Sequence, residues 1–109
     1  MKLIIGGACQ GKRAYAKEQY GENANIVVDF HLFILDLIKK GIDPVEYISG
    51  SLRDYSDKVI ICDDIFCGIV PTDPLLRRWR ESLGHVLGII TRESDEVVRV
   101  FCGIGVKLK

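Results

Sequence analysis

Short runs of Val, Ile and Leu alternate with helix-forming segments along this chain, and this alternation limits its possible folds more than any other feature. The predicted strands are residues 2–6, 25–30, 58–64 and 96–102, and the predicted helices are about 11–20, 31–40, 44–54 and 73–92. The first three strands are continuous apolar runs, which is typical of parallel strands buried on both faces. The fourth is interrupted by Arg99, so we expect it nearer an edge. The pattern predicts a three-layer α/β fold with a mainly parallel sheet.

Charge and hydropathy exclude two classes of partner. Fifteen basic and fifteen acidic side chains give no net charge, so the basic surface that nucleic-acid binding needs is not expected. The longest apolar run, residues 30–38, is too short to span a bilayer and contains Asp36, so no membrane association is expected. The four cysteines form no C-x-x-C pair, which favours reduced thiols over a zinc site or disulfides. These features predict a cytoplasmic protein.

The stretch "IIGGACQGKRAYA" (4–16) nearly matches the phosphate-loop pattern G-x-x-x-x-G-K-[ST]. An apolar strand precedes it and a helix-forming segment follows, so main-chain N–H groups and a helix N-terminus would converge on an anion. Lys12 would reach the terminal phosphates. The candidate nucleotide-binding residues are Gly6, Gly7, Ala8, Cys9, Gln10, Gly11, Lys12 and Arg13. The alternative is a glycine-rich turn followed by a surface lysine. With the chain length, the loop predicts one nucleotide-binding domain over residues 1–109.

Arg13 occupies the position at which the pattern requires Ser or Thr. In a working loop that hydroxyl coordinates Mg²⁺, which neutralises charge during phosphoryl transfer. A guanidinium cannot bind a cation, although it can contact a phosphate. We therefore expect Arg13 to weaken Mg²⁺-dependent catalysis more than phosphate binding.

Acidic residues follow two of the predicted strands and are candidates to hold a metal directly or through water. They are Asp29 after "NIVV" and the pair Asp63–Asp64 after "KVIIC". Each of these acids could instead serve as a helix cap or turn residue. His31 also follows a strand end, and its expected role is that of a partly buried residue at a helix start.

The helix predicted at 73–92 has the clearest boundary signals. Thr72 or Asp73 can cap it, and Pro74 suits its first turn. Gly84 and Gly88 reduce helix propensity, so we expect them to mark a close approach by another backbone.

The whole pattern resembles the bifunctional adenosylcobinamide kinase / adenosylcobinamide-phosphate guanylyltransferase family of cobalamin biosynthesis. "GIVPTDPLLRRWRESLG" (68–84) is similar to that family's G-I-V-P turn and R-x-x-R helix, and "SDEVVRVFCGIGVKLK" (94–109) to its A-D-E-V strand. "GGACQGKRAYA" is similar to its G-G-x-x-S-G-K-S-x-x-A, and "IVVDFHLFILDLI" (26–38) to its V-D-C-L-T segment.

The resemblance implies a P-loop fold, ATP or GTP as the nucleotide, and phosphorylation and guanylylation of a cobinamide. It implies catalytic roles for Lys12 and Asp29 and metal contacts for Asp29 and Asp64, with Mg²⁺ left open by Arg13. The family's segment that carries the guanylyl-accepting histidine is absent here, because Asn23 and Ala24 lead directly into "NIVVD". His31 does not align with that histidine.

Two functions therefore remain open. One is a nucleotide-binding enzyme of the cobinamide pathway, with kinase activity possible and guanylyl transfer by the histidine route lost. The other is a non-catalytic nucleotide- or corrinoid-binding sensor or scaffold. The partners expected are a nucleotide, adenosylcobinamide and further copies of the chain, which would associate through an exposed apolar side of residues 30–38.

Overall fold

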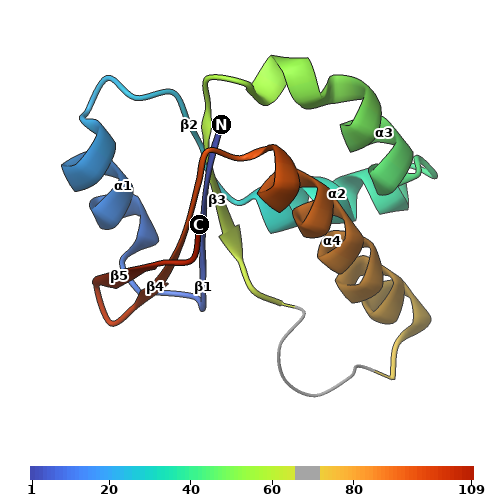
Figure 1. Cartoon of the computed structure of the whole chain (residues 1–109). Coiled ribbons are helices and arrows are strands. Elements are labelled where there is room, and N and C mark those ends of the chain that lie inside the picture. The colour runs from blue at the N-terminus through green and yellow to red at the C-terminus, as the bar shows by residue number, and fades with distance from the viewer. Residues whose placement is uncertain (66–71) are drawn as a thin grey trace.

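The computed structural model describes residues 1–65 and 72–109, which form one five-stranded sheet with helices on both faces (Figure 1). The strands are β1 (Lys2–Gly6), β2 (Ile26–Val27), β3 (Val59–Asp63), β4 (Glu96–Phe101) and β5 (Ile104–Lys107). The helices are α1 (Lys12–Tyr20), α2 (Phe30–Lys39), α3 (Pro44–Ser51), η1 (Leu52–Tyr55) and α4 (Pro74–Glu93). The "GIVP" motif at 68–71 lies outside the described residues.

The sheet has the order β2-β3-β1-β4-β5, and only the β4–β5 pairing is antiparallel. The central strand β1 has β3 on one side and β4 on the other, so the carboxyl ends of these parallel strands meet at one edge. The chain moves from one side of β1 to the other between β3 and β4. In open α/β sheets, ligands bind at such a change in strand order.

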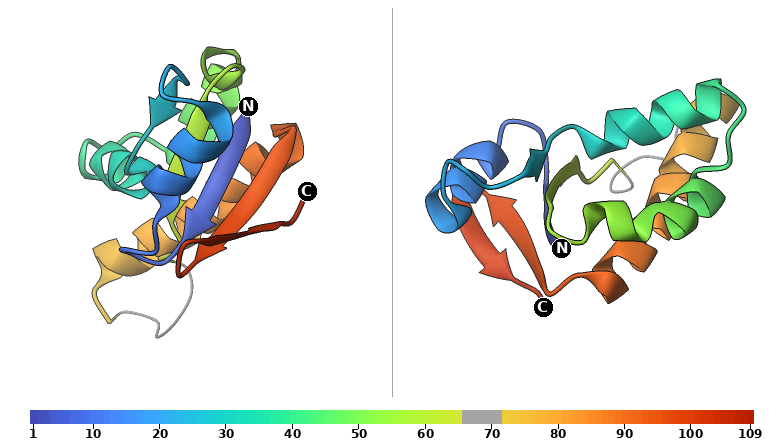
Figure 2. Two further views of the ribbon diagram at one scale, coloured as in Figure 1. Left: turned by 90° about the vertical axis from the view of Figure 1, so that its left-hand side faces the viewer. Right: turned by 90° about the horizontal axis from the view of Figure 1, so that it is seen from above.

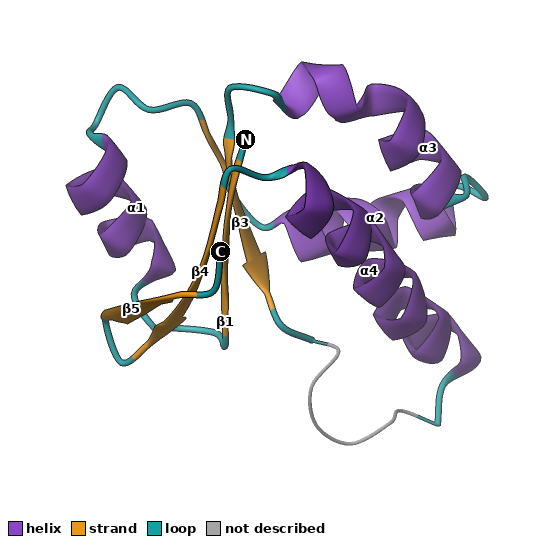
Figure 3. Cartoon of the chain, viewed as in Figure 1, coloured by secondary structure: helices purple, strands orange, loops and turns teal. Residues whose placement is uncertain are grey.

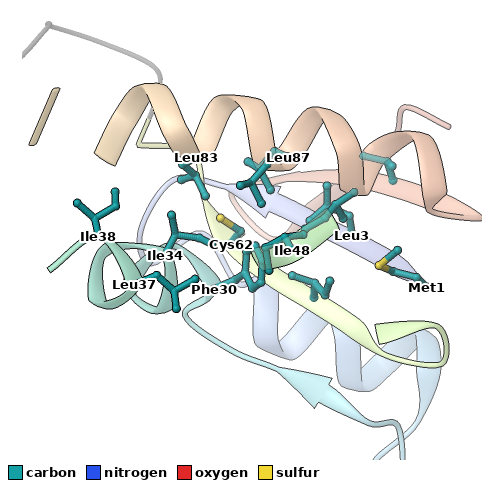
Figure 4. Packing of buried hydrophobic residues seen from close by; sticks show 14 residues of the cluster. Met1, Leu3, Phe30, Ile34, Leu37, Ile38, Ile48, Cys62, Leu83 and Leu87 are labelled. Carbon is teal, nitrogen blue, oxygen red and sulfur yellow. The ribbon is translucent and has the colours of Figure 1, made fainter. Parts of the chain in front are cut away.

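Helix α1 covers one face of the sheet, and α2, α3 and α4 cover the other, as all views show (Figures 2 and 3). Alternate residues of the buried strands supply the two cores, because successive side chains in a strand point to opposite faces. Ile4, Ile61 and Val98 pack with Ala16 of α1. Leu3, Ile60, Cys62 and Val97 belong to the larger core with α2, α3 and α4 (Figure 4). This arrangement confirms the predicted three-layer α/β fold.

The predicted second strand, residues 25–30, is wrong in length. Only Ile26 and Val27 pair with β3. Asp29 turns the chain with a left-handed φ of 52°, and α2 begins at the next residue. The early start of α2 therefore ends the strand.

The prediction that the fourth strand lies nearer an edge is also wrong, because β5 pairs with it on its outer side. Cys102 and Gly103 form the connecting turn, both with positive φ (49° and 77°), as two-residue hairpin turns require. The sequence prediction missed β5 because it ran one strand through residue 102 and did not identify this turn.

Two expectations about α2 and α4 are wrong as well. A Cβ added at Gly84 or Gly88 would meet no other atom within 4 Å, so neither glycine marks a close backbone contact. The apolar residues of α2 are core residues: Phe30, Ile34, Leu37 and Ile38 are at most 5% exposed. Residues 30–38 therefore do not present the continuous apolar surface that was expected for self-association.

The boundaries of α4 follow its sequence signals. Asp73 caps the helix, since its carboxylate accepts hydrogen bonds from the N–H groups of Leu75 and Leu76. Within the described residues, no helix is both long and apolar enough to cross a bilayer.

Candidate functional site

A pocket of about 400 Å³ lies where the loop after β1 meets the ends of β3 and the start of α2. Its lining includes most of the predicted loop and two of the three candidate acids. The lining residues are Ala8, Cys9, Gln10, Gly11, Lys12, Arg13, Ala14, Asp29, Ile61 and Asp63. Gly6, Gly7 and Asp64 do not line it. The structure thus brings residues 8–13, Asp29 and Asp63 to one cavity.

The loop has the backbone geometry that its glycines suggest. Gly11 precedes α1 in a left-handed conformation (φ 90°), which a residue with a side chain rarely adopts. It supplies no side-chain cap to the helix. Because the first N–H groups of a helix have no partner within it, the N-terminus of α1 offers hydrogen-bond donors and a partial positive charge at the pocket.

Lys12 is the first residue of α1 and is only 7% exposed. Its Nζ donates a hydrogen bond to the main-chain oxygen of Gly7 at 2.5 Å and lies 2.8 Å from Oδ1 of Asp63. A buried ammonium needs such partners, because removing a charge from water is costly. The lysine is therefore held inside the loop and is not a solvated surface residue.

Asp63 connects Lys12 to His31. Its Oδ2 lies 3.5 Å from Nε2 of His31, and its main-chain N–H donates to Nδ1 of the same ring at 3.2 Å. An accepting Nδ1 places the proton of a neutral ring on Nε2, which faces the carboxylate. Trp79 of α4 stacks on His31 and donates its indole N–H to the main-chain oxygen of His31 at 2.7 Å. His31 is buried at the start of α2, as predicted.

Asp64 points to another part of the molecule. Its carboxylate lies 3.6 Å from Arg99 of β4, and its N–H donates to the main-chain oxygen of Gly6. Adjacent residues leaving a strand have different directions, and the sequence alone did not tell which of the two acids would face Lys12. In the structure it is Asp63.

Arg13 and Asp29 form an ion pair at the mouth of the pocket, with 3.2 Å between guanidinium nitrogen and carboxylate oxygen. Both side chains are about half exposed, so the pair contributes little to stability. It nevertheless places a positive group beside the carboxylate that the sequence predicts as a metal contact. Among the described residues, no group of three or more His, Cys, Asp or Glu side chains could hold a metal ion.

Cys62, next to Asp63 in β3, does not add a nucleophile. Burial raises the pKa of its thiol to about 12. The thiol therefore stays protonated near neutral pH and acts as a small apolar side chain of the core.

An α/β sheet with a glycine-rich loop, a buried lysine and an acid at the neighbouring strand end defines a P-loop NTPase-like fold. A sequence model of the CobU family, "Cobinamide kinase / cobinamide phosphate guanyltransferase", matches residues 40–108. This match covers more than half of the chain, and the chain belongs to that family. The match includes β3 and the C-terminal hairpin but begins after the phosphate loop, so the loop rests on its own sequence and geometry.

One curated relative is the "Bifunctional adenosylcobalamin biosynthesis protein CobU" of Salmonella typhimurium. It is 36% identical over 62 residues, which are 57% of this chain. The aligned stretch spans only 34% of the relative's length. The family relation places the chain among proteins related to cobinamide kinases and guanylyltransferases.

Proposed function

We propose that this chain binds a nucleoside triphosphate, ATP or GTP, in the pocket at Lys12, and that it acts in cobalamin biosynthesis. The observation that carries the proposal is the buried Lys12 ammonium inside a glycine-rich loop at the N-terminus of α1. A cavity of about 400 Å³ is within the usual size range of small-molecule sites. The family relation supports the pathway.

Lys12 has a clear part in this proposal. Without ligand, its charge is balanced by Asp63 and the Gly7 carbonyl. A terminal phosphate would replace Asp63 as its partner, and the N-terminus of α1 would supply further donors. Asp29 keeps its proposed place at the mouth of the pocket, close to the incoming phosphates. Asp64, held by Arg99, is a less suitable metal contact than Asp63.

The role of Mg²⁺ is reduced in this proposal, because Arg13 supplies a positive charge where the loop pattern has a metal-binding hydroxyl. We expect native ATP affinity, measured by calorimetry, to change less than about twofold when Mg²⁺ is added. Arg13→Ser should make binding tighter with Mg²⁺ than without it by about fivefold or more, a difference of about 1 kcal/mol.

Arg53→Ser, an exposed change in η1 on another part of the surface, is the control and should leave the native response unchanged. If native binding already requires Mg²⁺, or if Arg13→Ser gains no response, the assignment of Arg13 is incorrect.

The ion pair of Arg13 and Asp29 favours a second function: a non-catalytic member that binds nucleotide or adenosylcobinamide as a sensor or scaffold. In this alternative, Arg13 neutralises Asp29 and no metal is bound between them. Phosphorylation of adenosylcobinamide by the native protein would exclude it. Guanylyl transfer by the family's histidine route is not part of either proposal, and both functions are placed in the cytoplasm.

We also propose self-association, through β5 in place of α2. Ile104, Val106 and Leu108 are 54–68% exposed along this edge strand, and two antiparallel copies of an edge can extend one sheet. Sedimentation velocity should show an oligomer that Val106→Lys dissociates. Lys107→Arg is the matched control on the same strand. A monomeric native protein would contradict the proposal.

A further inference from the structure

We propose that Gln10 is a positioning residue: it fastens the β4–β5 turn to the phosphate loop and so keeps the loop in its anion-binding shape. This inference rests on the proposed nucleotide site. The two segments joined are more than 90 residues apart in the chain, and the family match covers only one of them.

Gln10 makes two hydrogen bonds to the turn. Its side-chain Oε1 accepts the N–H of Cys102 at 2.7 Å, and its main-chain oxygen accepts the N–H of Gly103 at 2.8 Å. Both distances are typical of well-formed bonds. One loop residue therefore binds both residues of the turn, which lies beside the loop in Figure 1.

The shape of the turn explains why its N–H groups are available. Cys102 and Gly103 both have left-handed φ values and connect the paired residues Phe101 and Ile104. In a two-residue hairpin turn of this kind, the strand pair closes around the turn and its two N–H groups have no partner in the ladder. Gln10 provides acceptors for both.

Neighbouring contacts show that the hairpin and the loop fit closely. A Cβ added at Gly11 would lie 3.4 Å from Cα of Gly103. One added at Gly105 of β5 would lie 2.2 Å from the ring of Tyr15 in α1. The hairpin thus backs both the loop and the first turns of α1, and Gln10 is the polar connection within this contact.

Preformed loops bind ligands more tightly, because less conformational entropy is lost on binding. The same coupling acts in both directions, so a bound anion should in turn stabilise the turn. We therefore expect Gln10 to affect nucleotide affinity although its side-chain oxygen is already occupied by Cys102.

The test compares Gln10→Met, which keeps the length of the side chain and removes the acceptor, with Gln19→Met, the same change at an exposed position of α1. Gln10→Met should weaken ATP binding about fivefold to twentyfold in calorimetry and lower the melting temperature by no more than about 3 °C. Gln19→Met should retain native affinity.

Amide hydrogen exchange supplies a readout that does not depend on binding. Without ligand, the N–H of Cys102 should exchange faster in Gln10→Met than in the native protein, and ATP should slow its exchange in the native protein. Unchanged exchange in Gln10→Met, or native affinity in that variant, would overturn the positioning role and leave the proposed function intact. If the native protein binds neither ATP nor GTP, the proposed function fails and this inference fails with it.

Discussion

Replacing Lys12 by Met should weaken the binding of ATP and GTP by roughly thirtyfold or more, because hydrogen bonds to a charged group contribute about 2 kcal/mol. The variant also leaves the Asp63 carboxylate without its ammonium partner, 2.8 Å away in the native protein. That negative charge would then repel the phosphates. Isothermal titration calorimetry measures the effect directly.

Lys17→Met is the matched control, since Lys17 is an exposed lysine further along the same helix. Its affinity should remain native. The melting temperature of Lys12→Met should be measured as well, so that a loss of fold is not taken for a loss of contact. Native affinity in a folded Lys12→Met protein would show that the nucleotide does not contact this lysine.

Gly6→Ala should have the largest effect on stability. An added Cβ would lie 2.4 Å from the main-chain oxygen of Val100 in β4, closer than real Cβ contacts. The obstructing atom is backbone in the neighbouring strand, so it cannot move aside as a flexible side chain could. We expect a loss of about 3 kcal/mol in the free energy of unfolding, measured by urea denaturation.

Gly84→Ala is the control for this experiment. Gly84 lies within α4, is exposed, and would place its Cβ in open space. Alanine has the higher helix propensity, so this variant should gain about 0.5–1 kcal/mol. If Gly6→Ala were as stable as the native protein, the close contact between β1 and β4 would be incorrect.

The sequence predicted the buried parts of the fold better than its edges. Continuous apolar runs identify β1 and β3, because only strands covered on both faces have such runs. The length of β2 and the presence of β5 depend on two backbone turns, at Asp29 and at Cys102–Gly103. Asp29 and Cys102 are non-glycine residues with positive φ, which the sequence patterns do not reveal.

The candidate site was predictable only in part for the same reason. The loop from Gly6 to Lys12 could be recognised from its spacing and from the strand before it. Which carboxylate of Asp63–Asp64 faces the lysine depends on how the chain leaves β3. The two bonds from Gln10 to the turn could not be predicted, because they require the position of a hairpin that the sequence analysis had not found.

The most direct test of nucleotide binding is a calorimetric titration of the native protein with ATP, and then with GTP, in the absence of Mg²⁺. The account predicts saturable binding of one nucleotide per chain with a dissociation constant in the micromolar range, about −8 kcal/mol. No heat of binding with either nucleotide, even after Mg²⁺ is added, would contradict it.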